Sequence, residues 1–179
     1  LDPVVGTQSG SLIPMGLGET LLRLTPQGEP VPWLAEAVEP VDPSRWRVRL
    51  RAGVTFWNGK PVDAAAVRRS LERTVAKNPA AASLLGLAGA EVADPRTLVL
   101  RTTAPNGGVP SVLTSFQMVI HDAEEAASLG DAEYQKRAVL TGPFRPTDFQ
   151  LGESAALRRY EGYWGGLPAL ERAEFRRVA

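Results

Sequence analysis

The chain has 179 residues, of which 44% are hydrophobic and 22% are charged, and its 20 basic and 20 acidic residues cancel to a formal net charge of zero. This balance is typical of a globular protein and argues against a nucleic-acid binder, which needs a basic surplus to displace counterions from phosphates. The chain has no cysteine, so disulfides, thiolate zinc sites and cysteine nucleophiles are excluded.

No apolar run approaches the roughly 18–20 residues that cross a bilayer. The chain opens on Leu1-Asp2-Pro3 without a basic segment followed by an apolar one, so we expect no signal peptide within it. The first predicted strand is Trp46–Arg51, where Trp46, Val48 and Leu50 alternate with arginines in the period-two pattern of a half-buried strand. After it, Val54–Trp57 leads to Asn58-Gly59, a strong tight-turn signal.

The strongest helix prediction covers residues 64–77. Asp63 is placed to cap its first free backbone N–H groups, and Val67, Leu71 and Val75 recur every four residues as one apolar stripe. Charged residues, Arg73 among them, are expected outside that stripe. Lys77 complements the helix dipole, and the following Asn-Pro pair is expected to end the helix.

The remaining predicted elements are shorter. They are a helix at residues 80–87, a strand at 97–102, a helical turn at 110–114, a helix at 122–129 that ends at Gly130, and strands at 155–160 and 171–178. This mixture of strands and helices predicts an α/β or α+β protein.

The sequence does not predict an active site. His121 is the only histidine, no G-x-S-x-G elbow accompanies it, and a structural role at a strand end is the better interpretation. Glu124 and Glu125 are adjacent on a helix, so they diverge rather than converge on a metal ion, and we expect a solvated face there. The four tryptophans are scattered and are expected to pack in the core rather than to form a stacking surface for ligands.

Four stretches occur in a fixed order along the chain: PWLAE at residues 32–36, WRVRLRAGVTFWNGKPV at 46–62, the capped helix through residue 73, and TGPF at 141–144 followed by YWGGLP at 163–168. Together they resemble the peptide/nickel-type extracytoplasmic solute-binding proteins of ABC importers (family 5), and the resemblance covers nearly the whole chain.

This resemblance implies an α/β fold with α+β mixed sheets, the N-terminal lobe of a periplasmic-binding-protein type II fold. That fold closes two lobes around a solute by a hinge motion. Residues 1–28 and 119–179 would contribute to the cleft-forming lobe I and residues 29–118 would form its peripheral subdomain. We expect the second lobe to be absent from this chain, so the fold would be incomplete, and an apolar face left uncovered would favour self-association.

The function implied by the resemblance is capture of a small solute, most simply a peptide, and its delivery to the membrane permease of an ABC importer. The protein would be extracytoplasmic, either periplasmic or lipid-anchored at the cell surface, with no catalytic residue, cofactor or metal of its own. By the family pattern, ligand contacts fall at the N-terminal loop, in a helix of the peripheral subdomain and before the TGP motif. These places correspond to Thr7, Gln8 and Ser9, to Ser83 and Leu84, and to Ser115, Phe116 and Gln117.

Three alternatives stay open. One is a nickel- or metal-chelate-binding member of the same family, but such proteins carry an aromatic residue near position 83 and an arginine near position 117. Ser83 and Gln117 stand there in this chain, and a missing arginine removes a cation that could bind an anionic chelate. The others are a cytoplasmic regulator that reuses the binding fold beside a DNA-binding domain, and an enzyme on an unrelated fold.

Overall fold

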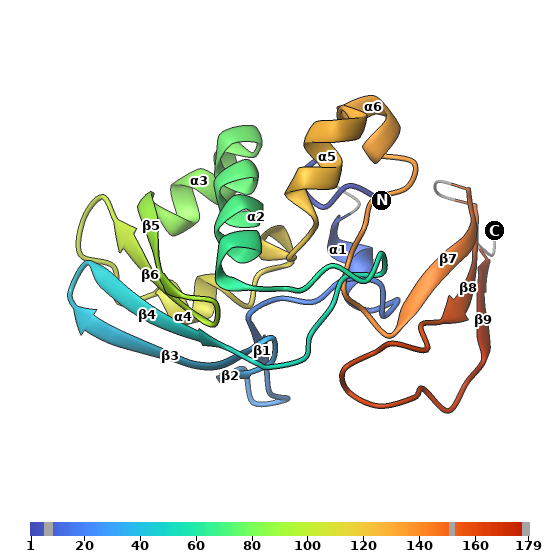
Figure 1. Ribbon diagram of the computed structural model, residues 1–179, viewed down its shortest axis with the longest axis horizontal. Helices are drawn as coiled ribbons and strands as arrows, with labels where there is room; N and C mark the ends of the chain where they lie inside the picture. Colours follow the sequence, from blue (N-terminus) through green and yellow to red (C-terminus); the bar gives the residue numbers. More distant parts are fainter. Residues whose placement is uncertain (6–8, 151–152, 177–179) are drawn as a thin grey trace.

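The structure is a computed structural model that describes residues 1–5, 9–150 and 153–176, with the side chain of Ser9 also outside the description. Figure 1 shows a four-stranded sheet covered on one side by two helices, and a three-stranded sheet at the opposite end of the molecule. Among the described residues every strand pairing is antiparallel. The predicted combination of helices with strands is confirmed.

The four-stranded sheet has the order β3-β4-β6-β5, formed by Ala35–Asp42, Arg45–Leu50, Thr97–Thr102 and Leu87–Asp94. The alternation predicted for β4 is confirmed, because Trp46, Val48 and Leu50 are buried while the arginines between them are exposed. Strands β3 and β5 were not predicted, and both lie at edges of the sheet.

Helix α2 covers this sheet and runs over Ala64–Lys77, as predicted. Asp63 accepts a hydrogen bond from the N–H of Ala66 at 2.8 Å, and Val67 and Leu71 are buried. Arg73 lies outside the apolar stripe, but its side chain is only 9% exposed, which the sequence did not indicate. Polar partners of its guanidinium lie against that flank of the helix, which the apolar pattern alone cannot reveal.

Asn78 ends α2 and begins the next helix. Its N–H donates to the carbonyl of Thr74, and its side-chain oxygen accepts from the N–H groups of Ala80 and Ala81 at the start of α3 (Pro79–Leu85). The helix predicted at residues 80–87 therefore starts and ends earlier, because Gly86 takes a left-handed conformation and Leu87 already belongs to β5.

The tight turn predicted at Asn58-Gly59 is present: Thr55 and Pro61 make one isolated bridge around it, and the φ of +83° at Gly59 favours glycine. The helical turn predicted at 110–114 begins one residue earlier, as α4 (Val109–Val112), and is followed by the 3₁₀ turn η1 (Phe116–Met118). A short hairpin of β1 (Leu22–Leu24) and β2 (Pro30–Pro32) precedes the large sheet.

The other end of the molecule contains α1 (Ser9–Leu12), α5 (Ala123–Leu129), α6 (Asp131–Tyr134) and the sheet β7-β8-β9, formed by Phe144–Gln150, Ser154–Arg159 and Arg172–Arg176. The helix predicted at 122–129 is confirmed, with Asp122 as its cap and Gly130 at its end. Strands β8 and β9 lie within one residue of their predicted starts, and residues 177–179 lie outside the description.

Two cores hold these parts together. The larger one lies between the four-stranded sheet and α2, and the smaller one gathers Leu17, Val119, Tyr134, Leu140 and Leu157 near the three-stranded sheet. Backbone contact is close beside the smaller core, because a Cβ on Gly142 would lie 2.3 Å from the carbonyl oxygen of Gly16. In the described part of the chain, no helix is long and apolar enough to cross a membrane.

Candidate ligand-binding face

The segment from Ser115 to Gln117 presents an exposed aromatic ring on a fixed turn. Ser115 caps η1 by accepting a hydrogen bond from the N–H of Gln117 at 3.3 Å, and Met118 anchors the turn in the larger core. The side chain of Phe116 remains 44% exposed and that of Gln117 is half-buried. An exposed aromatic flanked by uncharged polar groups can contact apolar and amide parts of an organic ligand.

The other predicted contact residues lie on α1 and α3. Ser83 and Leu84 are on the outer face of α3 and exposed, whereas Leu85 and Ala81 fasten that helix to the core. Ser9 begins α1 by its backbone, and Thr7 and Gln8 lie outside the described residues.

The structure brings α1, which begins at Ser9, next to the turn that contains Phe116 and Gln117. Helix α1 packs directly against η1, and α3 packs against α4, the turn that precedes η1 along the chain. We name α1 and residues 115–117 the binding face and treat Ser83 and Leu84 as its neighbour one element away.

A buried polar cluster that the sequence did not predict is centred on Arg73 of α2. Both guanidinium Nη atoms of Arg73 donate to the carboxylate of Asp2, at 2.9 and 2.6 Å, and the Asp2 side chain is fully buried. Nη1 also lies 3.1 Å from Nε2 of His121, and Nη2 donates to Asp131 at 3.1 Å. The aromatic ring of Tyr134 lies under the same guanidinium, 5.1 Å from its centre.

The contacts of His121 define its protonation. A guanidinium nitrogen can only donate, so Nε2 of His121 accepts from Arg73 and carries no proton. The ring proton is therefore on Nδ1, which lies 3.1 Å from the carbonyl oxygen of Val119 and donates to it. The pKa of His121 is lowered to about 4, mainly by burial; the hydrogen bond to the Val119 carbonyl raises it, and the charge of Arg73 lowers it. The histidine is neutral at pH 7, and the structural role predicted for it fits these contacts.

Glu19 is a second buried ionisable group, held by the YWGG stretch. The hydroxyl of Tyr163 donates to its carboxylate at 2.8 Å, and Nε1 of Trp164 donates to both carboxylate oxygens at 3.2 Å. Burial raises the pKa of Glu19, while these hydrogen bonds lower it. Trp164 is half-buried and Arg51 stacks on it, so this tryptophan packs a corner of the fold.

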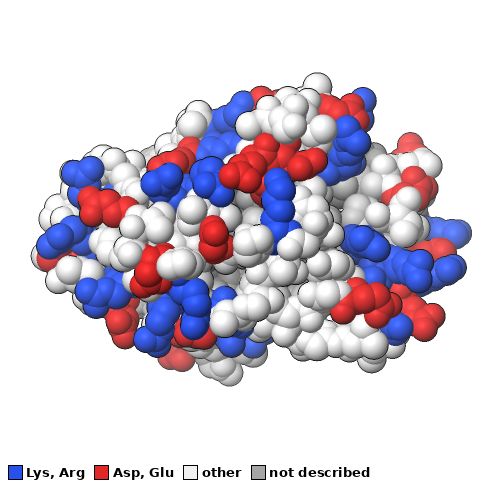
Figure 2. All heavy atoms as spheres, in the orientation of Figure 1, with Lys and Arg blue, Asp and Glu red and all other residues white. Residues whose placement is uncertain are grey.

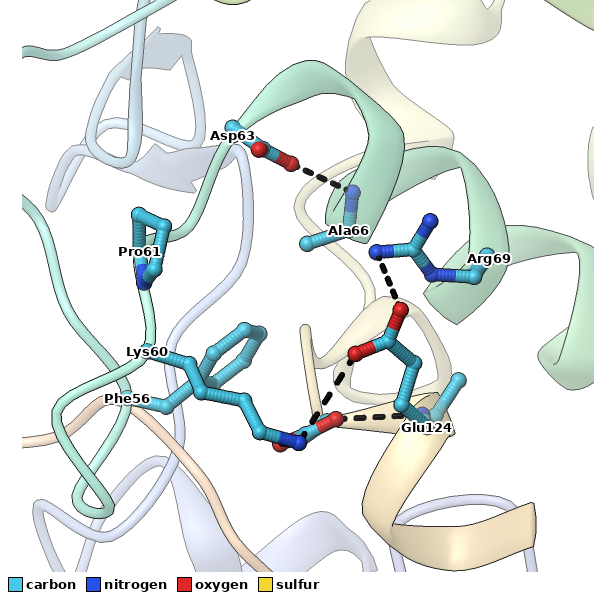
Figure 3. A pocket seen from close by; sticks show the side chains of 9 residues that line it. Phe56, Lys60, Pro61, Asp63, Ala66, Arg69 and Glu124 are labelled. Atoms are coloured by element: carbon cyan, nitrogen blue, oxygen red, sulfur yellow. Dashed lines mark hydrogen bonds and ion pairs between the residues drawn. The ribbon is translucent and has the colours of Figure 1, made fainter.

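A small cavity of about 240 Å³ lies where the first turns of α2 and α5 meet (Figure 3). Lys60 approaches Asp122 at 3.0 Å and both Glu124 and Glu125 at 3.7 Å, and Arg69 pairs with Glu124 at 3.0 Å. Glu124 and Glu125, expected on a solvated helix face, thus also take part in ion pairs. Figure 3 shows the charged side chains of Lys60, Arg69 and Glu124 joined across the cavity.

A wider groove of about 490 Å³ runs between α2 and α5, lined by Arg69, Glu72, Arg73, Lys77, Ala123, Ala126, Ala127, Gly130 and Asp131. Its basic groups are paired, since Lys77 and Arg73 both pair with Asp131 and Arg69 pairs with Glu124. Figure 2 shows the two signs of charge interspersed over the visible face rather than gathered by sign. Within the described ranges no group of three or more potential ligands could hold a metal ion. Neither hollow contains a predicted contact residue.

Comparison with known proteins places the chain in a family. Residues 29–179 match the family model described as "Bacterial extracellular solute-binding proteins, family 5 Middle". A solved structure titled as a nickel ABC transporter from Bacillus halodurans superposes with a TM-score of 0.86 and 35% identity, over 98% of this chain and 36% of that one.

Two curated relatives show how much of such proteins the chain represents. The nickel-binding protein NikA of Staphylococcus aureus is 23% identical over 89% of this chain and 31% of its own length. The glutathione-binding protein GsiB of Salmonella paratyphi A is 27% identical over 74% of this chain and 27% of its own length. The chain thus spans about a third of its relatives, which are named for binding rather than catalysis.

The shared fold is that of one part of a type II periplasmic binding protein, in agreement with the predicted partial lobe. The predicted resemblance and the non-catalytic class are confirmed, and the chain belongs to family 5 of the bacterial extracellular solute-binding proteins.

Proposed function

We propose that this chain forms one side of the cleft of an extracytoplasmic solute-binding protein that captures a small solute, most simply a peptide, and passes it to the permease of an ABC importer. In this proposal residues 1–28 and 119–179 belong to the cleft-forming lobe and residues 29–118 to its peripheral subdomain. Membership of family 5 supports the class of function.

The packing of α1 against η1 carries the proposal for the ligand. It places α1, which begins at Ser9, against the turn that contains Phe116 and Gln117, more than 100 residues further along the chain. All eight proposed contact residues are uncharged: Thr7, Gln8, Ser9, Ser83, Leu84, Ser115, Phe116 and Gln117. Such a surface suits a ligand that offers amide groups and apolar side chains, as a peptide does. GsiB, which is named for glutathione, a tripeptide, supports this class.

Mass spectrometry of solutes that co-purify with the full-length protein tests the proposal. We expect a peptide-class solute, and glutathione or tripeptides should raise the melting temperature. Phe116→Ala should weaken this binding, whereas Leu167→Ala, which truncates an exposed side chain that is not among the proposed contact residues, should leave it unchanged. Recovery of buffer components alone, with no thermal shift across peptide, chelate and sugar panels, would overturn solute binding altogether.

A nickel chelate is the second candidate ligand, because the 35% identical solved structure is titled as a nickel ABC transporter and aligns with nearly the whole chain. The side chain of His121 is buried and bonded to Arg73 and Val119, so it is not available as an exposed metal ligand. A nickel solute would therefore have to arrive as a preformed chelate. Titration with Ni²⁺ in the presence and absence of L-histidine distinguishes the cases, since only the chelate should bind.

A further inference from the structure

Arg73 joins three parts of the molecule through one guanidinium. From α2 it reaches Asp2 near the start of the chain, His121 after η1, and Asp131 at the beginning of α6. Its side chain is 9% exposed, and that of Asp2 is fully buried. A bidentate arginine–carboxylate pair fixes both position and orientation, which a single hydrogen bond does not.

Two of these partners, Asp2 and His121, lie in chain segments that lead to the proposed binding face. A carboxylate oxygen of Asp2 also accepts from the N–H of Val4 at 3.1 Å, so the pair fixes the backbone at the entrance to the N-terminal segment. His121 donates from Nδ1 to the carbonyl of Val119, two residues beyond Gln117. Ser70, one turn before Arg73, accepts from the backbone N–H of His121 at 3.0 Å and ties the same segment to α2.

We infer that Arg73 is a positioning residue for the binding face: it holds the segment at Asp2 and the segment at His121 in register with α2 while remaining outside the solute site. This inference rests on the proposed function. The fork requires arginine, because a lysine ammonium cannot span both oxygens of Asp2 and also donate to Nε2 of His121 in one plane. The unprotonated Nε2 is a direct signature of that donation.

The decisive variant is Arg73→Lys in the full-length protein, which keeps the charge and removes the fork. Arg69→Lys is the matched control, because Arg69 lies one turn earlier on α2 and pairs with the exposed Glu124. Ring nitrogen NMR, assigned by the signals lost in His121→Gln, should show wild-type His121 protonated on Nδ1 alone. Arg73→Lys should introduce the Nε2-protonated tautomer, and Arg69→Lys should not.

Hydrogen exchange measures the positioning itself and needs no ligand. In Arg73→Lys, peptides covering residues 1–12 and 115–122 should exchange about tenfold faster, while those covering β4 and β6 keep their wild-type rates. Equal acceleration everywhere would mean that Arg73 serves only global stability, and no acceleration would refute positioning. Asp2→Asn should reproduce the localised pattern, and it decides the question should Arg73→Lys fail to fold.

A binding measurement then separates this inference from the function beneath it. Glutathione and the Ni²⁺–L-histidine complex are titrated into the wild type and both variants, and whichever probe binds should bind Arg73→Lys at least about tenfold more weakly. Unchanged affinity in Arg73→Lys would overturn the positioning role. Failure of both probes with the wild type would count against the proposed ligands alone, because the exchange and NMR results test Arg73 independently.

Discussion

The regions around the two sheets differ in how many large apolar side chains they leave exposed. In the four-stranded sheet, Leu98 and Leu100 of β6 are fully buried beneath α2, which lies between β4 and β6 in the chain and folds back over the sheet (Figure 1). Around the three-stranded sheet, Leu167, Leu170 and Phe175 are 59%, 64% and 42% exposed. Leu157 of β8 is also buried, in the smaller core, so the second region packs a core and at the same time leaves several large apolar side chains exposed.

Truncation of a core side chain should separate the two regions most clearly. Leu98→Ala removes a fully buried side chain beneath α2 and should cost about 3 kcal/mol in the free energy of unfolding. Phe175→Ala on β9 should cost less, about 1 kcal/mol, because this residue is 42% exposed and so loses less buried surface. Urea unfolding of both variants measures the difference, and similar costs would break the comparison.

Lowering the pH should destabilise the fold through the buried His121. The folded-state pKa of His121 lies near 4, below its ordinary value of 6.5, so the unfolded chain binds a proton at a higher pH than the folded chain does. Stability should therefore fall as pH decreases from about 6.5 to about 4, by at most about 1.4 kcal/mol per pH unit and by about 2–3 kcal/mol in all.

Unfolding free energies of the wild type and His121→Gln across this pH window provide the measurement. The wild type should lose stability as the pH falls and His121→Gln should lose less, since the amide oxygen of glutamine can accept from Arg73 without titrating. Parallel profiles would show that another group controls the acid response. Glu19 acts in the opposite direction, because its raised pKa makes the folded state more stable as the pH falls.

Removing the side-chain caps of α2 and α5 should change the free energy of unfolding by smaller amounts. Asp63→Ala removes one cap bond from α2 and should cost about 1 kcal/mol. Asp122→Ala should cost more, about 2 kcal/mol, because Asp122 caps α5 and also binds Asn58 and Lys60 from the loop before α2. Thermal unfolding of the pair ranks the two changes, and the reverse order would show that the links to Asn58 and Lys60 contribute little.

The smallest effect on stability should accompany a change in association. Leu170→Ser alters an exposed side chain, so we expect a stability change below about 0.5 kcal/mol. We predict that the 179-residue chain self-associates in size-exclusion chromatography with light scattering, and that this variant shifts it towards monomer. A clean wild-type monomer that binds no hydrophobic dye would contradict the prediction.

Local signals made some elements predictable and left others hidden. Helix α2 and strand β4 follow from a cap and from alternating residues. The missed strands β3, β5 and β7 are all edge strands that contain Pro40, Gly89 and Pro146 respectively, and edges tolerate such residues because one side needs no ladder bonds. The binding-face residues came from family resemblance, and their ligand contacts stay a prediction.

The cluster around Arg73 could not be read from the sequence, because its partners are 71 residues away at Asp2 and 48 away at His121. Nothing in the local pattern of α2 distinguishes Arg73 from Arg68 and Arg69, whose side chains are 39% and 36% exposed. Only the folded chain reveals which of them is buried.

The bond between Glu19 and Tyr163 links residues 144 positions apart, and this separation sets an order of events during synthesis. At 5–20 residues per second, a ribosome needs on the order of 10 s to make Tyr163 after Glu19. The four-stranded sheet and α2 can form in that interval, since residues 35–102 include all of them. Tyr163 and Trp164, which are made after the sheet, therefore supply hydrogen bonds to a carboxylate that was made before it.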